Sequence, residues 1–255
     1  MTVELILLCL VAIGAGFIDS IVGGGGLLQT PAILIILPHY PVATLLGTTK
    51  IPSITGTSFA AYRYSRHIKM DRNILFLIIG TAFIGAILGA YSISMVSSAT
   101  IKPVILALLL ITAVYTYSKK DFGLHQEKNH TPGRQILTGL TFGFVIGFYD
   151  GLIGPGTGTF LILAFISLLG FDFLHSSANA KYVNVATNLA AILYFAGTNH
   201  ILYEYAIPMA VFNLSGSLLG TRMALVKGNK FIRTLFLIVV FGTILRFAYD
   251  IFIKG

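Results

Sequence analysis

The sequence predicts an all-α polytopic membrane protein that is built from two repeats. Hydrophobic residues make up 56% of its 255 residues and charged residues only 10%, and the mean hydropathy is +0.87. A soluble domain carries about 25% charged residues. Apolar segments of roughly 17–25 residues, the length that spans a bilayer core, recur along the chain. The longest hydrophilic stretch, 119–134, is too short to bury a core of its own.

A duplicated segment reveals the repeat. Residues 16–26 read GFIDSIVGGGG and residues 147–157 read GFYDGLIGPGT, an offset of 131 residues (147 − 16). The same offset carries Lys50 onto Lys181 and Lys102 onto Arg233. It also carries Gly85 and Gly89 onto Gly216 and Gly220. An ungapped offset over nearly the whole chain indicates one structural unit used twice.

Each half contains five hydrophobic segments in the same order. They are 3–22, 27–37, 42–64, 73–95 and 101–118 in the first half, and 136–153, 159–170, 175–195, 205–226 and 231–253 in the second. The second segment of each half has about 11 or 12 residues, which as a helix covers about half of the hydrocarbon core. A Gly cluster separates it from the first segment. We therefore expect a Gly-broken helical hairpin to open each repeat, whether or not the short segments cross the membrane fully.

Loop charge predicts that the two repeats are inverted. The loop after the third segment of the first half is basic, with Arg63, Arg66, Lys69 and Arg72, whereas its counterpart at 196–204 has no Lys or Arg. Lys227 and Lys230 instead follow the fourth segment of the second half. Basic loops stay in the cytoplasm. The pattern predicts repeats at 1–122 and 134–255, a cytoplasmic linker at 123–133, and multi-pass insertion in the cytoplasmic (inner) membrane.

Composition excludes several classes of function. The net charge of +8 lies in loops between spans, where it sets topology, so no nucleic acid partner is expected. Cys9 is the only cysteine, and no His, Cys, Asp or Glu spacing matches a metal site. The sequence has no P-loop, dinucleotide fingerprint or nucleophile elbow. We expect no cofactor, no metal and no enzymatic activity, and an ion gradient as the energy source.

The two glycine clusters are candidate anion sites. Each leads into a short helix whose free N–H groups and positive dipole end would bind an oxyanion. The candidate residues are Gly23, Gly24, Gly25, Gly26, Gly154, Gly156, Thr157 and Gly158. The alternative is that these glycines only allow close helix packing. Packing is the better interpretation for the glycines at 85, 89, 216 and 220, because nothing breaks those helices.

Asp19 and Asp150 occupy equivalent positions inside apolar segments. A carboxylate at membrane depth costs a few kcal/mol and is seldom retained without a role. Three roles are open: proton carrier, partner of a lysine, or cap of the half-helix turn. Proton coupling and positioning of the site are thus the candidate functions of this pair.

Lys50 and Lys181 lie well inside the third segment of each half, among hydroxyl and amide side chains. Snorkelling to the interface is one interpretation. The other is a cationic cavity for substrate, to which Thr49 and Asn184 would add hydrogen bonds. Further candidates of lower rank are Thr48, Ser53, Asn179 and Asn188. The two aspartates would offset the two lysines, which would leave the empty site formally neutral.

The doubled Gly-Phe-x-Asp-x-x-x-Gly motif, together with Gly-Thr-Thr-Lys at 47–50, resembles the TauE/SafE family of membrane proteins, also called the sulfite exporter or toluene-sulfonate uptake permease family. The resemblance covers essentially the whole chain. It implies transport of small sulfur-containing anions, such as sulfite or organosulfonates, across the cytoplasmic membrane.

We therefore expect a secondary transporter of small sulfur-containing anions that is coupled to an ion or proton gradient. Its partners would be a small anionic substrate and the lipid bilayer. The sequence leaves open whether the protein forms a homo-oligomer. The alternatives are an anion channel and an intramembrane accessory or enzyme subunit. Paired aspartates would suit an aspartyl protease only if they met and shared a proton beside a substrate groove.

Overall fold

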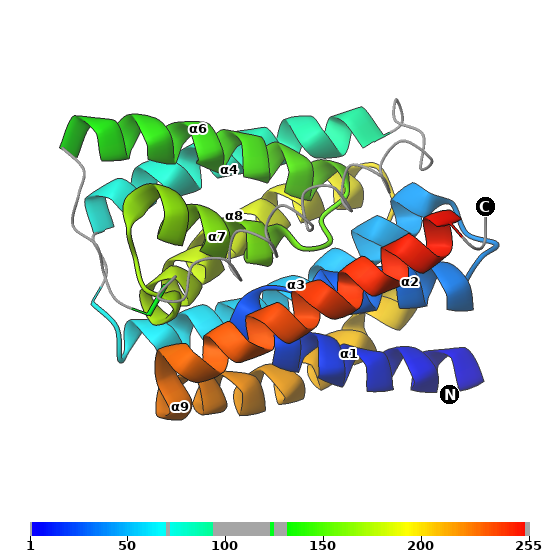
Figure 1. The fold of residues 1–255 in the computed structure, drawn as a ribbon. Helices are drawn as coiled ribbons and strands as arrows, with labels where there is room; N and C mark the ends of the chain where they lie inside the picture. Colours follow the sequence, from blue (N-terminus) through cyan, green and yellow to red (C-terminus); the bar gives the residue numbers. More distant parts are fainter. Residues whose placement is uncertain (1, 70–71, 94–122, 125–131, 253–255) are drawn as a thin grey trace.

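In the computed structural model, the described residues are 2–69, 72–93, 123–124 and 132–252. This part of the chain is all-helical (Figure 1). The helices are α1 (Val3–Val22), α2 (Gly25–Ile36), α3 (Val42–Ser65), α4 (Arg72–Ser92), α6 (Pro132–Leu152), α7 (Thr157–Leu169), α8 (Phe173–Gly197) and α9 (Tyr203–Phe252). α9 consists of two helices that meet at Gly228, whose φ of 67° and ψ of −161° are not helical.

The helices confirm nine of the ten expected hydrophobic segments, with ends that differ by a few residues. The expected segment 101–118 lies outside the described residues. The two short segments are helices of 12 and 13 residues, α2 and α7. The last two segments of the second half, expected at 205–226 and 231–253, are the two parts of α9.

Local signals explain where several helices begin and end. The Thr2 hydroxyl caps α1 and the Asp172 carboxylate caps α8, each by accepting a backbone N–H of the first turn. α1 ends at Gly23, whose left-handed φ of 73° suits a residue without a Cβ. Gly156 precedes α7 with a φ of 85°, so both glycine clusters break the helix through left-handed backbone.

Among the described residues, three helical stretches are long and apolar enough to cross a membrane: Val3–Val22, Asn73–Ser92 and Gly133–Leu152. α3 and α8 have 24 and 25 residues, but each carries polar side chains that are buried inside the molecule. Large apolar side chains such as Val3, Phe76 and Val226 are instead exposed on the outside. The fold is thus apolar outside and partly polar inside, as a membrane protein with an internal site requires.

The helices of the two halves pack across each other in a reciprocal way. α1 packs along α9, and α6 packs along α4. Gly85 of α4 lies against the backbone of Phe144 in α6, and Gly216 of α9 lies against the backbone of Ile13 in α1. Gly89 and Gly220 do the same one turn further along, against Phe148 and Phe17. Phe144 and Ile13 are themselves related by the 131-residue offset (144 − 13). These glycines confirm the predicted packing role.

The reciprocal packing places the two glycine breaks near the middle of the molecule. α1 and α6 begin at opposite ends of the bundle in Figure 1, and each leads to the centre before the chain breaks. The short helices α2 and α7 start from these breaks, and α3 and α8 pack against each other beside them.

Candidate functional site

The two glycine breaks touch each other. A Cβ on Gly23 would collide with the backbone of Gly158, and a Cβ on Gly158 would collide with the backbone of Gly23. Gly26 lies against Pro155 in the same way, with 3.1 Å from an ideal Cβ to the proline Cα. The clusters therefore have a packing role between the two halves, beside any role in binding.

The short helices α2 and α7 begin at this contact. Gly24 is the N-cap of α2 and Gly156 is the N-cap of α7, and neither helix end has a side-chain cap. Gly25 and Gly26 belong to the first turn of α2, as Thr157 and Gly158 do to that of α7. The hypothesis that an aspartate side chain caps these turns is wrong, because both carboxylates bind lysines instead.

Lys50 of α3 binds Asp150 of α6. Its Nζ donates to the Asp150 backbone carbonyl at 2.7 Å and to the carboxylate Oδ1 at 2.9 Å. Thr157 Oγ1 also donates to Oδ1, at 2.8 Å. The side chains of Lys50 and Asp150 are 6% and 3% exposed. This is a buried ion pair between the two halves of the chain.

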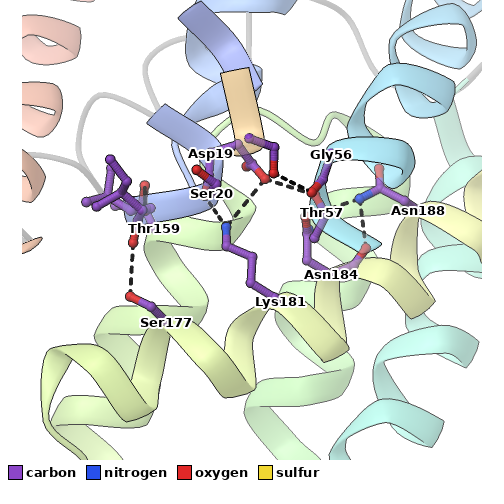
Figure 2. Close-up of polar contacts among 12 residues, drawn as sticks. Asp19, Ser20, Gly56, Thr57, Thr159, Ser177, Lys181, Asn184 and Asn188 are labelled. Carbon is purple, nitrogen blue, oxygen red and sulfur yellow. Dashed lines mark hydrogen bonds and ion pairs between the residues drawn. The ribbon is translucent and has the colours of Figure 1, made fainter. Parts of the chain in front are cut away.

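Lys181 of α8 binds Asp19 of α1 in the same manner (Figure 2). Its Nζ donates to the Asp19 backbone carbonyl and lies 3.4 Å from the carboxylate Oδ2. Thr57 Oγ1 donates to the same Oδ2 at 2.9 Å. The Lys181 side chain is fully buried, whereas that of Asp19 is 15% exposed.

Each lysine thus pairs with the aspartate of the other half. Both use the backbone carbonyl and the carboxylate of their partner, as a duplicated site would. The snorkelling interpretation is wrong for both lysines, because their ammonium groups lie inside the molecule. The expectation that the aspartates offset the lysines is confirmed. The carboxylates of Asp19 and Asp150 bind separate lysines, which does not match a protease dyad that shares one proton.

The last carbonyls of α1 are all bound by side chains from other helices. Tyr64 Oη donates to the Ser20 carbonyl at 3.1 Å. Ser177 Oγ donates to that of Ile21 at 3.0 Å and Thr159 Oγ1 to that of Val22 at 3.1 Å, beside the Lys181 bond to Asp19. Figure 2 shows Ser177 and Lys181 reaching this helix end from α8. The four carbonyls that a helix leaves unpaired are therefore satisfied without water, as membrane depth demands.

A cavity of about 30 Å³ lies at the junction of the two halves, enough for about two water-sized groups. Its lining includes ten of the predicted site residues: Asp19, Gly23, Gly26, Thr49, Lys50, Asp150, Gly154, Thr157, Gly158 and Asn184. Ser53 and Asn188, predicted with lower rank, also line it. Gly24, Gly25, Gly156 and Lys181 are not among its lining residues, and their role in binding substrate stays a prediction.

Sequence reasoning missed several residues at the site. Thr30 and Ile153 line the cavity. Gln29 Nε2 donates to the Thr49 carbonyl at 3.3 Å, and its Oε1 accepts from Asn213 Nδ2 at 3.2 Å. Both amides are buried, so they tie α2 to α3 and α9 beside the cavity. Gln29 and Asn213 are polar residues within apolar segments, and this could have identified them from the sequence. The search for repeated positions passed over them because their equivalents in the other half, Phe160 and Ala82, are apolar.

Two asparagines of α8, Asn184 and Asn188, line the cavity. Asn188 Nδ2 donates to the backbone carbonyl of Asn184 at 2.7 Å and to its side-chain oxygen at 3.1 Å (Figure 2). The expected amide surroundings of Lys181 on this helix are thus present, with Asn184 and Asn188 one turn apart.

Comparison with known proteins identifies the family of the chain. The family described as Sulfite exporter TauE/SafE matches residues 8–247. The probable membrane transporter protein ORF9 of a Sinorhizobium species is 35% identical over 92% of this chain and 89% of its own. Relatives named probable membrane transporter protein are 33% identical in Haemophilus influenzae, over 96% of this chain and 94% of the relative, and 31% identical in Escherichia coli (YfcA), over 94% and 88%. No solved structure matches significantly. The chain belongs to the TauE/SafE family of membrane transporters.

Proposed function

We propose that the protein is a secondary transporter of small sulfur-containing anions, such as sulfite or a sulfonate, in the cytoplasmic membrane. One observation carries this proposal: the buried Lys50–Asp150 pair, Asp19, and the first turns of two short helices without side-chain caps meet at one small cavity. Helix N-termini and a lysine in a low-dielectric site favour a bound anion. The family is described as a sulfite exporter family, which supports a sulfur oxyanion as the class of the bound anion.

The cavity dimensions support a small substrate. Its volume of about 30 Å³ suits an ion of a few atoms better than a bulky organic molecule. Thr49, Asn184 and Asn188 line it. The Thr49 hydroxyl donates to the Leu46 carbonyl and the Asn188 amide donates to Asn184, so these two donors would have to exchange partners to bind the oxygen atoms of an anion. Lys50 lines the cavity, so we assign its ammonium group as the one that binds the anion.

We further infer that the two halves are inverted repeats that alternate access to this cavity. The reciprocal glycine contacts, the crossed ion pairs and the opposite starting ends of α1 and α6 support this arrangement. In transporters of this kind, a site at the repeat interface is exposed to one side at a time.

Uptake into liposomes that contain the pure protein tests the function. Labelled sulfite, thiosulfate, methanesulfonate and p-toluenesulfonate are offered singly, with labelled glycerol as a neutral control. We expect saturable uptake of at least one of the four anions and none of glycerol. A Lys50→Met/Asp150→Asn variant, which removes both charges of the cavity pair together, is the matched control and should not take up the anion.

Two results would contradict the proposal. If folded protein takes up none of the four anions, small sulfur-containing anions are not its substrates. Single-channel currents in a planar bilayer would show that the protein is a channel, since a transporter moves too few ions per cycle to produce them.

A further inference from the structure

The two ion pairs differ in how they are held, although they occupy equivalent positions. Asp19 Oδ2 receives donors from both Lys181 and Thr57. In Asp150, Oδ1 receives the two donors, while Oδ2 is buried without a hydrogen-bond partner among the described residues. A buried carboxylate oxygen without a donor typically costs about 1–3 kcal/mol, so its retention calls for an explanation.

The helix ends that carry the two aspartates differ as well. The end of α1 is held by Tyr64, Ser177 and Thr159, which bind its last three carbonyls. The 131-residue offset maps these three donors onto Phe195, Leu46 and Leu28, respectively. None of the three has a side-chain donor. Among the described residues, the end of α6 therefore lacks the three equivalent donors that hold the end of α1, and the sequence difference at these positions explains it.

The cavity is also asymmetric. Lys50 and Asp150 both line it, whereas Lys181 does not. The Lys181 ammonium is fully buried against the clamped end of α1. Of the two lysines, Lys50 is therefore the one placed at the cavity.

We propose that the two pairs have divided their roles: Lys50–Asp150 is the working pair, in which Asp150 carries the proton that accompanies the anion bound by Lys50, and Lys181–Asp19 is a fixed brace. This rests on the proposed function and specifies its coupling. The Lys181–Asp19 brace keeps α1 and α8 together while the end of α6 changes its contacts.

The charges balance through this step. Asp19, Asp150, Lys50 and Lys181 sum to zero in the empty site. An anion that enters alone leaves one net negative charge in a low-dielectric cavity, beside the Asp150 carboxylate that competes for Lys50. When Asp150 Oδ2 takes up a proton, the carboxyl group becomes neutral, Lys50 is free to bind the anion, and the sum returns to zero. Release on the other side returns the proton to water and restores the ion pair.

Among the described residues, few titratable or charged groups surround Asp150. Lys50 faces it from α3 and Asp19 from α1 across the cavity, while α7 contributes the neutral Thr157. Tyr149, its neighbour on α6, donates its hydroxyl to the Pro155 carbonyl. Lys181 of α8 is engaged with Asp19. α4 presents Ala82, Gly85, Ala86 and Gly89 to α6, none of which titrates.

Infrared difference spectroscopy tests the assignment without any substrate. The wild type, Asp150→Asn and the matched Asp19→Asn variant are placed in lipid nanodiscs, and spectra at acid and alkaline pH are subtracted. We expect a band from a protonated carboxylic acid in the wild type that disappears in Asp150→Asn and persists in Asp19→Asn. Loss of the band in Asp19→Asn instead, or no titrating buried band in the wild type, overturns the proposal.

Transport measurements test the coupling. The first probe in liposomes is labelled methanesulfonate, which stays anionic throughout the assay, so any requirement for protons belongs to the protein. The second probe is labelled sulfite, and its uptake is compared between the variants. An inward proton gradient should stimulate net uptake by the wild type. Asparagine mimics a neutral Asp150, so Asp150→Asn should lose this stimulation, measured as the ratio of uptake with the gradient to uptake without it. In Asp19→Asn, the ratio of uptake with the proton gradient to uptake without it should stay as in the wild type. Loss of the brace lowers only the amount of folded protein.

The outcomes separate this proposal from the proposed function. If the wild type carries neither probe nor any other of the four anions, the function fails and the coupling fails with it. If the wild type carries anion while Asp150→Asn keeps the gradient stimulation, the function stands and the assignment of Asp150 is overturned.

Discussion

The backbones of Gly23 and Gly158 pack directly against each other at the junction of the two halves. Gly23 ends α1 with a φ of 73°, and Gly158 lies in the first turn of α7. Neither position has room for a Cβ, because the atoms in the way are backbone atoms of the other glycine. This contact brings the start of α7, which belongs to the second half, onto the end of α1.

Gly158→Ala should destabilise the protein strongly. The added methyl group meets backbone rather than a flexible side chain, so the two halves must move apart, at a cost of about 1–3 kcal/mol or more. Gly23→Ala should be at least as damaging, because its left-handed conformation adds about 1–2 kcal/mol for a residue with a Cβ. Thermal unfolding of the protein in detergent measures both.

Gly80→Ala is the matched control for these substitutions. Gly80 lies inside α4, and no atom of the described residues lies within 4 Å of an added Cβ. Alanine there should be neutral or stabilise the helix by up to about 1 kcal/mol. Equal unfolding temperatures for Gly158→Ala and Gly80→Ala would contradict the contact.

Lys50→Met should destabilise the protein because it leaves Asp150 buried without its countercharge. Removal of one partner of a buried ion pair typically costs about 3–5 kcal/mol. Adding Asp150→Asn should restore most of the stability, since the uncompensated charge is then gone, but should not restore anion uptake. Unfolding curves and uptake assays on the single and double variants check both parts. A single variant as stable as the wild type would show that the pair does not form.

Tyr64→Phe should also destabilise the protein, although it keeps the ring and introduces the residue found at the equivalent position, Phe195. It leaves the Ser20 carbonyl without the Tyr64 hydroxyl, at a cost of about 1–3 kcal/mol. Phe195→Tyr is the reciprocal control and gains no known partner. Unfolding of both variants is compared with that of the wild type, and an unchanged Tyr64→Phe protein would argue against the clamp on α1.

Single-cysteine labelling tests the inverted orientation. Ser65 at the end of α3 and Thr198 at the end of α8 are both exposed, and the native Cys9 is buried and can be changed to serine. A membrane-impermeant maleimide should label Cys at 65 only from the cytoplasmic side and Cys at 198 only from the outside. Labelling of both from one side would contradict inverted repeats.

Much of the architecture could be predicted from the sequence because it depends on local properties. Apolar runs gave the helices, including the two short ones, and left-handed backbone at Gly23 and Gly156 broke them where the glycine clusters stand. The 131-residue offset selected Asp19, Asp150, Lys50 and Lys181 as four related members of one site.

The sequence by itself determined ten of the residues that line the cavity, whereas the tertiary structure added others and decided which side chains meet. Lys50 pairs with Asp150 and Lys181 with Asp19 because α1 and α6 each pack on a helix of the other half. A repeat offset shows which positions are equivalent. It does not show whether each lysine pairs with the aspartate of its own half or with that of the other half. The Gln29–Asn213 bond and the withdrawal of Lys181 from the cavity depend in the same way on packing between distant segments. Helix formation follows from neighbours along the chain, but an ion pair between residues 100 positions apart is set only when the helices assemble.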